Sequence, residues 1–246
     1  MNRGFYTLAS GMMTRQRSLN AIANNMANGK TPGFKSERVV TTTFEQELMI
    51  RKEGNKETAI GKGAPVNMVE DIVSDFNAAQ LMQTDSPYDI AIQGDGYFAV
   101  AKDGGQQYLT RNGHFNIDAE GFLILPDQGR VQGIKGDIKI GGAGFSVDSQ
   151  GTVYDDKGKL VDTLLIQAPA EGTTLPKYAN GMYVAEGELV PVTTPNTAQF
   201  VYEGSNVDYN NEMALMMETQ RSFQSCSKAL TMIDQINQKA VNLGSV

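Results

Sequence analysis

The sequence predicts an α+β protein in which N- and C-terminal helices pair as a coiled coil around a central antiparallel β domain of short hairpins. Three observations favour this fold: an apolar stripe near the C-terminus, a matching stripe near the N-terminus, and repeated hairpin signals between them. The expected regions are an N-terminal helix (1–30), an extended connecting region (31–74), the β domain (75–200) and a C-terminal helix (201–246).

The C-terminal segment from Ser205 to Val246 contains no proline, and its apolar residues recur at alternating three- and four-residue steps. That spacing predicts one helix of about 35 residues, roughly 50 Å long at 1.5 Å per residue. Ser205 and Asp208 have the spacing of a capping box at its start. A helix this long needs a partner of similar length, in this chain or another. Its stripe consists of Met216, Thr219, Phe223, Cys226, Leu230, Ile233, Asn237 and Ala240.

Residues 1–28 carry the other stripe of this kind, which consists of Phe5, Leu8, Met12, Leu19, Ile22 and Met26 and is interrupted by Arg15. The two stripes predict a coiled-coil pair, and two ordinary amphipathic helices packed on a common core are the alternative. The first helix is expected to end near Asn28–Gly29, because Thr31-Pro32-Gly33 prevents it from continuing.

The segment from Phe34 to Ser74 has no clear periodicity, and its polar stretch 51–65 is typical of a loop. Strand patterns begin after it. Asp89–Val100 predicts two short strands, and Lys102–Gly105 predicts a hairpin turn.

An internal repeat follows in Phe115–Ile124 (FNIDAEGFLI) and Phe145–Tyr154 (FSVDSQGTVY). Each copy predicts a strand, an Asp-x-x-Gly turn and a second strand, because Asp bonds to its own backbone in such turns and Gly supplies the positive φ. VYDDKGKLV repeats the hairpin pattern at once.

Composition limits the function classes. The net charge of −7 argues against a nucleic-acid partner, for which a basic surface is expected. Residues 1–30 lack the apolar run of a secretory signal, and no stretch has the length of a membrane span. The basic N-terminal helix is also compatible with a transit peptide or a membrane-surface helix, but the C-terminal stripe provides a protein partner for the same face.

Catalytic chemistry has little support in the sequence. His114 is the single histidine and Cys226 the single cysteine, so they cannot supply the four nitrogen or sulfur ligands of a structural zinc site. We expect His114 to be solvated in a turn and Cys226 to be a small buried residue of the helix stripe.

Two further motifs resemble chemical sites only superficially. Gly141–Gly144 precedes a strand, whereas a phosphate-binding loop precedes a helix. The acidic pairs Asp118/Glu120 and Asp155/Asp156 lie in turn sequences, where acids serve the backbone. We therefore expect no enzyme activity, cofactor, metal or small-molecule substrate.

Specific motifs do point to a family. Ala23-Asn-Asn-Met-Ala-Asn28 followed by Thr31-Pro-Gly-Phe-Lys35 resembles the N-terminal signature of the bacterial flagellar axial proteins, which include rod, hook and hook-junction subunits. DIAIQGDGYFAV, LTRNGHFNIDAEGFLI, EGSNVDYNNEM, QRSFQSCSKAL and DQINQKAVNL are similar to later segments of the rod proteins, in the same order. The C-terminal series is most similar to that of a distal rod subunit, and a proximal rod or hook-type subunit is the alternative.

The resemblance implies a structural subunit of the flagellar rod, the tubular drive shaft that transmits torque through the periplasm from motor to hook. It implies self-assembly into a helical homo-oligomer, contacts with other rod and hook axial proteins, and passage through the flagellar type III export apparatus without a cleaved signal peptide. In such proteins the terminal helices pair and line the inner tube, and the β domain faces outward. A rod-associated peptidoglycan-cleaving enzyme and a secreted interaction module are the alternatives of other classes.

The assembly interface is expected on the terminal helices and the turn after the first one. Asn24, Asn25 and Asn28 are expected to bond across subunits or to cap the helix end, the alternative being that they fray its last turn. The expected interface comprises Phe5, Leu8, Met12, Leu19, Ile22, Asn24, Asn25, Met26, Asn28, Thr31, Pro32, Gly33, Phe34, Met216, Gln220, Arg221, Phe223, Leu230 and Ile233.

Overall fold

The computed structural model describes residues 3–43, 47–53, 56–63, 67–102, 106–141, 144–178 and 181–244. The chain divides into two compact units. Unit 1 consists of residues 1–27, 37–75 and 208–246, and unit 2 consists of residues 28–36 and 76–207. Terminal helices in contact with each other and a central antiparallel β region confirm the predicted fold class.

Unit 1 contains two long helices, α1 (Arg3–Ala27) and α2 (Tyr209–Gly244). The 36 residues of α2 match the length that its apolar stripe predicts. The predicted capping box is wrong in detail, because Asp208 itself caps the helix. Its Oδ1 accepts the backbone N–H groups of Asn210 and Asn211 at 3.0 and 3.2 Å, which satisfies two donors of the first turn.

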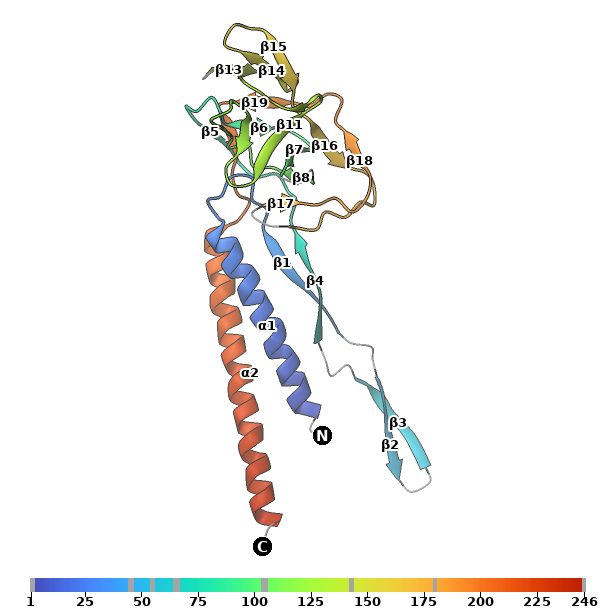
Figure 1. Ribbon diagram of the computed structural model, residues 1–246. Coiled ribbons are helices and arrows are strands. Elements are labelled where there is room, and N and C mark those ends of the chain that lie inside the picture. The colour runs from blue at the N-terminus through green and yellow to red at the C-terminus, as the bar shows by residue number, and fades with distance from the viewer. Residues whose placement is uncertain are drawn as a thin grey trace. The chain divides into compact units, whose positions relative to one another are not determined.

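A β-ribbon completes unit 1 (Figure 1). β1 (Glu37–Thr43) pairs antiparallel with β4 (Asn67–Ser74), and β2 (Glu47–Glu53) pairs with β3 (Lys56–Gly63). The β-branched run in β1 suits an extended backbone, and both β1 and β4 contact α1. The polar stretch 51–65 was expected to be a loop, yet much of it forms β2 and β3. Hydrophobic alternation is the pattern that predicts a strand, and the sequence of residues 51–65 lacks it.

Unit 2 is built from short antiparallel strands. The largest sheet has the strand order β17-β8-β7-β11-β10-β9, with β12, β16 and β18 attached, and β13-β14-β15, β19-β6 and β20-β5 form smaller sheets. The strands are β5 (Leu81–Gln83), β6 (Ile90–Ile92), β7 (Tyr97–Ala101), β8 (Gln107–Thr110), β9 (Asn116–Ile117), β10 (Leu123–Leu125), β11 (Gly129–Gly133), β12 (Gly136–Asp137), β13 (Phe145–Val147), β14 (Thr152–Asp155), β15 (Leu160–Thr163), β16 (Ile166–Pro169), β17 (Met182–Tyr183), β18 (Leu189–Pro191), β19 (Thr197–Gln199) and β20 (Val201–Glu203).

The predicted hairpins are present. β6 and β7 are the two strands expected in Asp89–Val100, and β7 pairs with β8 across the expected turn, of which residues 103–105 lie outside the described part of the chain. The internal repeat forms β9–β10 and β13–β14, and the third hairpin motif forms β14–β15.

One turn geometry recurs in these three hairpins. Oδ1 of Asp118 accepts the N–H groups two and four residues later, at 2.9 and 2.8 Å, and Gly121 has a φ of 87°. Asp148 and Asp155 make the same pair of bonds. The acids of these turns therefore serve the backbone, as their sequence context predicts.

The core of unit 2 lies between its sheets. It is formed by buried aliphatic and aromatic side chains, among them Phe98 and Phe115, whose rings meet edge to face with centroids 5.0 Å apart. A smaller cluster joins Tyr97, Leu109 and Tyr183. Among the described residues, neither cluster includes a residue of the terminal helices, which belong to unit 1. Within the described chain, neither helix combines the length and apolarity required to cross a membrane.

Candidate assembly interface on the terminal helices

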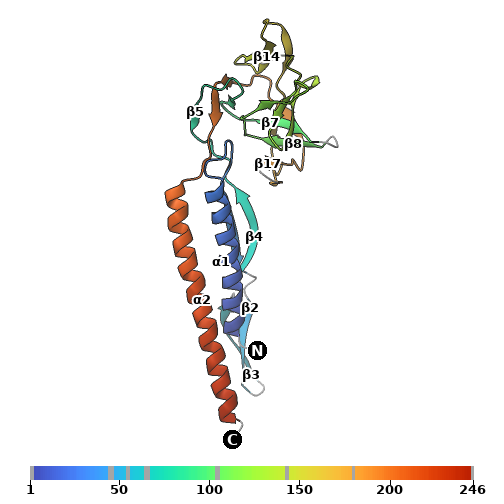
Figure 2. The same ribbon diagram turned by 60° about the vertical axis from the view of Figure 1, so that its left-hand side comes forward.

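The two helices of unit 1 run antiparallel and side by side (Figures 1 and 2). A Cβ placed on Gly4 would lie 3.8 Å from Ile233 Cδ1, and one on Gly11 would lie 4.0 Å from Cys226 Sγ. From Gly4 to Gly11 and from Ile233 to Cys226 the step is seven residues in opposite directions. A seven-residue repeat keeps one seam of each helix facing the other, as in a coiled coil. The glycines leave room for the side chains of α2.

The predicted stripe of α2 faces α1 over most of its length. Met216, Phe223, Cys226, Leu230 and Ile233 are half-buried and Thr219 is buried, whereas Asn237 and Ala240 are exposed. On α1, Ile22 is buried and Leu8, Met12, Leu19 and Met26 are half-buried, whereas Phe5 is exposed. Of the remaining predicted residues of α2, Gln220 and Arg221 are exposed.

Asn25 joins three elements of unit 1. It is 1% exposed at the end of α1, and its Oδ1 accepts the backbone N–H of Glu37 in β1 at 2.9 Å. Its Nδ2 donates to the backbone oxygen of Glu37 at 2.8 Å and to Glu212 Oε1 in α2 at 3.0 Å. This one amide therefore fixes the end of α1, the start of the ribbon and the start of α2. Asn24 adds a bond from Nδ2 to Glu37 Oε2 at 3.1 Å.

The environment of Glu212 disfavours its charged form. Burial raises the pKa of this carboxyl above its ordinary value, and the nearby charge of Asp208 raises it further. The hydrogen bond from Asn25 opposes these effects. Its other oxygen, Oε2, is buried and has no hydrogen-bond partner among the described residues.

The turn after α1 belongs to unit 2. Thr31 bonds to Asn28 through both its backbone N–H, at 3.0 Å, and its hydroxyl, at 3.2 Å. Gly33 has a φ of 66°, and a Cβ there would lie 2.3 Å from the backbone of Arg111. Pro32 is half-buried and Phe34 is fully buried, with Lys177 Nζ 4.0 Å from the centroid of its ring. These contacts lie within the chain, so this turn has a defined structural role before any assembly.

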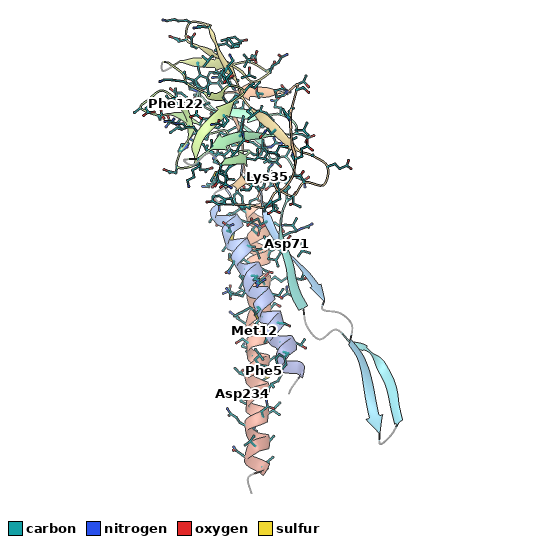
Figure 3. All side chains as sticks on the ribbon, turned by 45° about the vertical axis from the view of Figure 1, so that its right-hand side comes forward. Phe5, Met12, Lys35, Asp71, Phe122 and Asp234 are labelled. Atoms are coloured by element: carbon teal, nitrogen blue, oxygen red, sulfur yellow. The ribbon has the colours of Figure 1, made fainter. Side chains whose placement is uncertain are left out.

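Both helices also expose large apolar side chains that their mutual contact leaves uncovered. Met13 is 64% exposed on α1, and Leu243 is 81% exposed near the end of α2. Figure 3 marks Phe5 and Met12 on α1 and Asp234 on α2. Because Gly4 lies opposite Ile233, the last turns of α2 extend past the described start of α1. The other exposed apolar residues of the helices are Phe5, Tyr6, Tyr209, Met213, Leu215, Met217, Met232, Ile236 and Val241.

Three family models match this chain. The "Flagella basal body rod protein" model matches residues 5–35, the "Flagellar hook protein FlgE/F/G D1 domain" model matches residues 91–154, and the "Flagellar basal body rod FlgEFG protein C-terminal" model matches residues 198–243. These ranges cover most of α1 with its turn, much of the β region, and nearly all of α2.

Full-length relatives decide the assignment. The chain is 32% identical over 266 residues to the flagellar basal-body rod protein FlgG of Bacillus subtilis, covering 99% of each chain. It is 30% identical over 260 residues to the flagellar basal-body rod protein FlgF of Caulobacter vibrioides, covering 100% of each. The chain belongs to the flagellar basal-body rod protein family. The flagellar hook protein FlgE of Helicobacter mustelae is 33% identical over 149 residues, which cover 56% of this chain and 32% of the hook protein.

Membership of the rod protein family confirms the resemblance found in the sequence and makes the chain a structural subunit of the flagellar basal body, not an enzyme. Cys226 and His114, the residues considered above for catalysis and metal binding, have structural surroundings. Cys226 is half-buried on the helix seam. His114 is largely exposed, but it is not merely solvated, because its Nδ1 lies 2.5 Å from Oδ1 of the buried Asp89.

Sequence reasoning missed several residues that organise the structure. Gly4 and Gly11 escaped notice because a hydrophobic-periodicity search counts only apolar side chains. Glu37 and Glu212 were not connected to Asn25, because hydrogen bonds between distant positions leave no local pattern. The seven-residue step from Gly4 to Gly11 was the available signal, since glycines at that spacing on a predicted helix indicate a close helix–helix approach.

Proposed function

We propose that this chain is a distal rod subunit that assembles with copies of itself into a helical tube, using α1 and α2 as the principal contact between subunits. The observation that carries the proposal is the set of exposed apolar side chains on both α1 and α2. Fully burying one such side chain contributes about 1.5–3 kcal/mol. Covering several of them therefore favours polymerisation, against the entropic cost of association.

The position within the rod rests on the C-terminal motif series. FlgG and FlgF relatives match at similar identity, so the comparisons alone do not separate the two. We propose the distal position, and the proximal rod and the hook-type position are the alternatives.

The partners follow from assembly at the two ends of such a tube. Rod family membership implies assembly with rod and hook proteins. We propose that copies of this chain stack on another rod protein at one end and meet a hook-type protein at the other, after leaving the cell through the flagellar export apparatus without loss of an N-terminal signal peptide. Intact-mass measurement of the protein from purified basal bodies tests the last point, because α1 must still be present.

A deletion strain tests the proposed position. Quantitative mass spectrometry of purified hook–basal bodies should find many copies of this chain, and electron microscopy of the deletion strain should show a shortened rod without a hook. A rod that is missing altogether would assign the proximal position instead. An intact rod in the deletion strain would reject the rod-subunit proposal in favour of a secreted interaction module.

A matched pair of variants tests the contact surface. Met13→Asp places a charge on an exposed apolar position of α1, and Gln16→Asp places the same charge on an exposed polar position of that helix. Met13→Asp should abolish assembly while its secretion into the medium continues, and Gln16→Asp should assemble. Equal assembly by the two variants would remove Met13 from the interface.

A further inference from the structure

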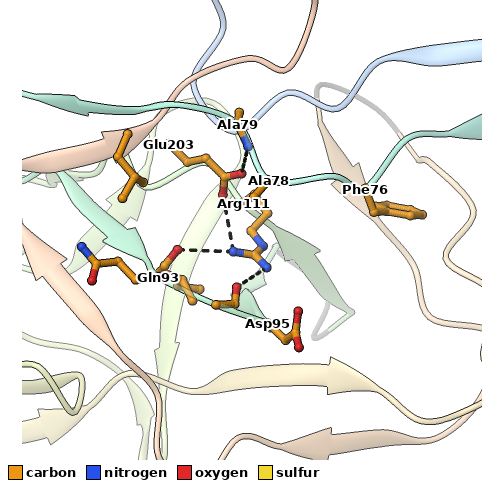
Figure 4. Close-up of a pocket in the computed structure, with 10 residues that line it drawn as sticks. Phe76, Ala78, Ala79, Gln93, Asp95, Arg111 and Glu203 are labelled. Carbon is orange, nitrogen blue, oxygen red and sulfur yellow. Dashed lines mark hydrogen bonds and ion pairs between the residues drawn. The ribbon is translucent and has the colours of Figure 1, made fainter.

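Glu203 is a buried carboxylate that binds three other parts of unit 2, and Figure 4 shows its contacts with Ala79 and Arg111. It is 2% exposed, and its Oε1 accepts Lys35 Nζ at 2.6 Å and the backbone N–H of Ala79 at 3.0 Å. Its Oε2 lies 3.4 Å from Nη1 of Arg111. Lys35 is equally buried, at 1% exposure, so this is an interior ion cluster rather than a surface pair.

The backbone around Glu203 is bound to the same segments. Its carbonyl oxygen accepts the N–H of Gly33 at 2.7 Å, and the N–H of Gly204 donates to Gln80 at 2.9 Å. Lys35 Nζ also donates to the carbonyl oxygen of Asn77 at 2.8 Å. Segments 33–35, 77–80 and 203–204 are therefore held together by side-chain and backbone bonds at one place.

A second bridge lies beside the first. Oδ1 of Asn206 accepts the N–H of Ser36 at 2.7 Å, and the N–H of Asn206 donates to the carbonyl oxygen of Phe34 at 3.3 Å. Arg111 connects the cluster to the β region, because its guanidinium donates to the carbonyl oxygen of Gly94 at 2.7 Å. The joined segments are thus fixed to the body of unit 2.

These segments have a special place in the chain. The chain passes between the two units four times, after residues 27, 36, 75 and 207. Each crossing lies within about six residues of a segment fastened at Glu203, the most distant being the one after residue 27. The covalent connections between unit 1 and unit 2 therefore run through residues that adjoin these segments.

Interior ion clusters are more sensitive than surface ones to the removal of one partner. A surface ion pair contributes little because water screens it, whereas removing one partner of a buried pair is strongly destabilising, because the other buried charge loses compensation. Removing Lys35 should therefore weaken the neighbouring contacts at Glu203, with Arg111 left as the remaining cation beside its carboxylate.

We propose that Glu203 is a mechanical latch that transmits torque between the helices and the β unit by fastening all the connecting segments to the body of unit 2. The claim that torque passes through Glu203 rests on the proposed function as a rod subunit. The claim that Glu203 fastens the connecting segments does not, because it concerns the single chain. The two claims are therefore tested separately.

The local part is tested by hydrogen exchange on the full-length chain in solution. Lys35→Met removes one cation from the cluster. Arg130→Met is the matched control, since it removes a cation from a partly exposed cluster elsewhere in unit 2, where Arg130 lies 2.8 Å from Glu120 and 3.3 Å from Asp137. Lys35→Met should speed exchange at the latch amides by about tenfold or more and leave the core amides protected. The latch amides are those of Gly33, Ser36, Ala79 and Gly204, and the core amides are those of Ala99 and Leu123.

Two results would overturn the latch. One is unchanged exchange at the four latch amides, and the other is an equal rise at the core amides, which indicates a general loss of stability. Should Lys35→Met not fold, Lys35→Arg keeps the charge while changing its geometry, and the same comparison applies. Because the chain is measured as a monomer, these outcomes do not depend on whether it forms rods.

The mechanical part is tested in cells. With Lys35→Met, swimming in dilute medium should be normal, but swimming speed in viscous medium should fall well below that of Arg130→Met cells. If Lys35→Met speeds exchange at the latch amides but the two strains swim at equal speed in viscous medium, torque is not transmitted through Glu203. Absence of the wild-type chain from basal bodies would instead reject the proposed function and leave the exchange result standing.

Discussion

Asn25 donates its side-chain amide to Glu212 Oε1 across 3.0 Å and so connects the last turn of α1 to the first turn of α2. The two residues are far apart in sequence, yet they close the end of the helix pair. Asn25 also holds both backbone groups of Glu37, the first residue of β1. The order of unit 1 at this end depends on one buried amide.

Asn25→Ala should destabilise unit 1. The change removes the bonds that Asn25 makes to the N–H and carbonyl of Glu37 and to the Glu212 carboxylate. Each such bond contributes about 0.5–1.5 kcal/mol. Urea unfolding followed by circular dichroism at 222 nm, which reports the helices, should show a clearly lower midpoint. Asn20→Ala is the control, because Asn20 is exposed and bonds only to Gln16 among the contacts assigned to it. Equal midpoints for the two variants would contradict the role of Asn25.

Glu212 should make unit 1 less stable as the pH rises. Its pKa is raised by burial and by Asp208, so the folded state binds the proton more tightly than the unfolded state. The stability that this group contributes is present below its ordinary pKa of 4.5 and is lost as the pH rises through the folded value. Glu212→Gln, which retains an acceptor for Asn25, should therefore gain stability relative to wild type between pH 4 and pH 7.

The gain for Glu212→Gln should be below about 1 kcal/mol, because the carboxyl is only partly buried and solvent screens its charge. Urea unfolding at several pH values measures it, with Glu218→Gln at an exposed position of α2 as the control. A constant difference between Glu212→Gln and wild type across this pH range would show that Glu212 is not the titrating group.

Gly33 should tolerate no side chain. Alanine at a φ of 66° is strained by about 1–2 kcal/mol, and the Cβ would also lie 2.3 Å from the backbone of Arg111. Gly158 has a φ of 71° but nothing within 4 Å of such a Cβ, so Gly158→Ala isolates the strain. Thermal unfolding of unit 2 should show a small loss for Gly158→Ala and a much larger one for Gly33→Ala. Similar losses of stability for the two variants would show that the backbone at residue 33 shifts away from Arg111 and relieves the contact.

The sequence predicts those parts of the fold that depend on local patterns. The α2 stripe through Phe223 and Leu230 faces α1 because a helical period fixes which side chains share a face. The turns at Asp118 and Asp148 follow from an Asp that bonds to its own backbone and a Gly that supplies positive φ. Each of these signals is formed by residues that are only a few positions apart in the sequence.

The parts that sequence reasoning did not predict depend on distant residues. Lys35 and Glu203 are separated by 168 positions, and neither has a neighbouring pattern that marks a buried ion pair. The β1–β4 ribbon depends on the register of strands joined by a polar stretch. Gln220 and Arg221 are exposed on the single chain. Their predicted contacts with other subunits remain predictions.

The spacing of the two helices should depend on the small residue at Gly11. A Cβ there would meet Cys226 Sγ at 4.0 Å, an ordinary contact, so Gly11→Ala fits. Alanine also has a helix propensity about 1 kcal/mol better than glycine, and the variant should unfold at a higher temperature than wild type. Gly11→Leu places more atoms in the same seam, and overpacking of this kind costs about 1–3 kcal/mol. Thermal unfolding followed by circular dichroism should show a higher unfolding temperature for Gly11→Ala and a lower one for Gly11→Leu. A lower unfolding temperature for Gly11→Ala would mean that even a methyl group does not fit between α1 and α2 at this position.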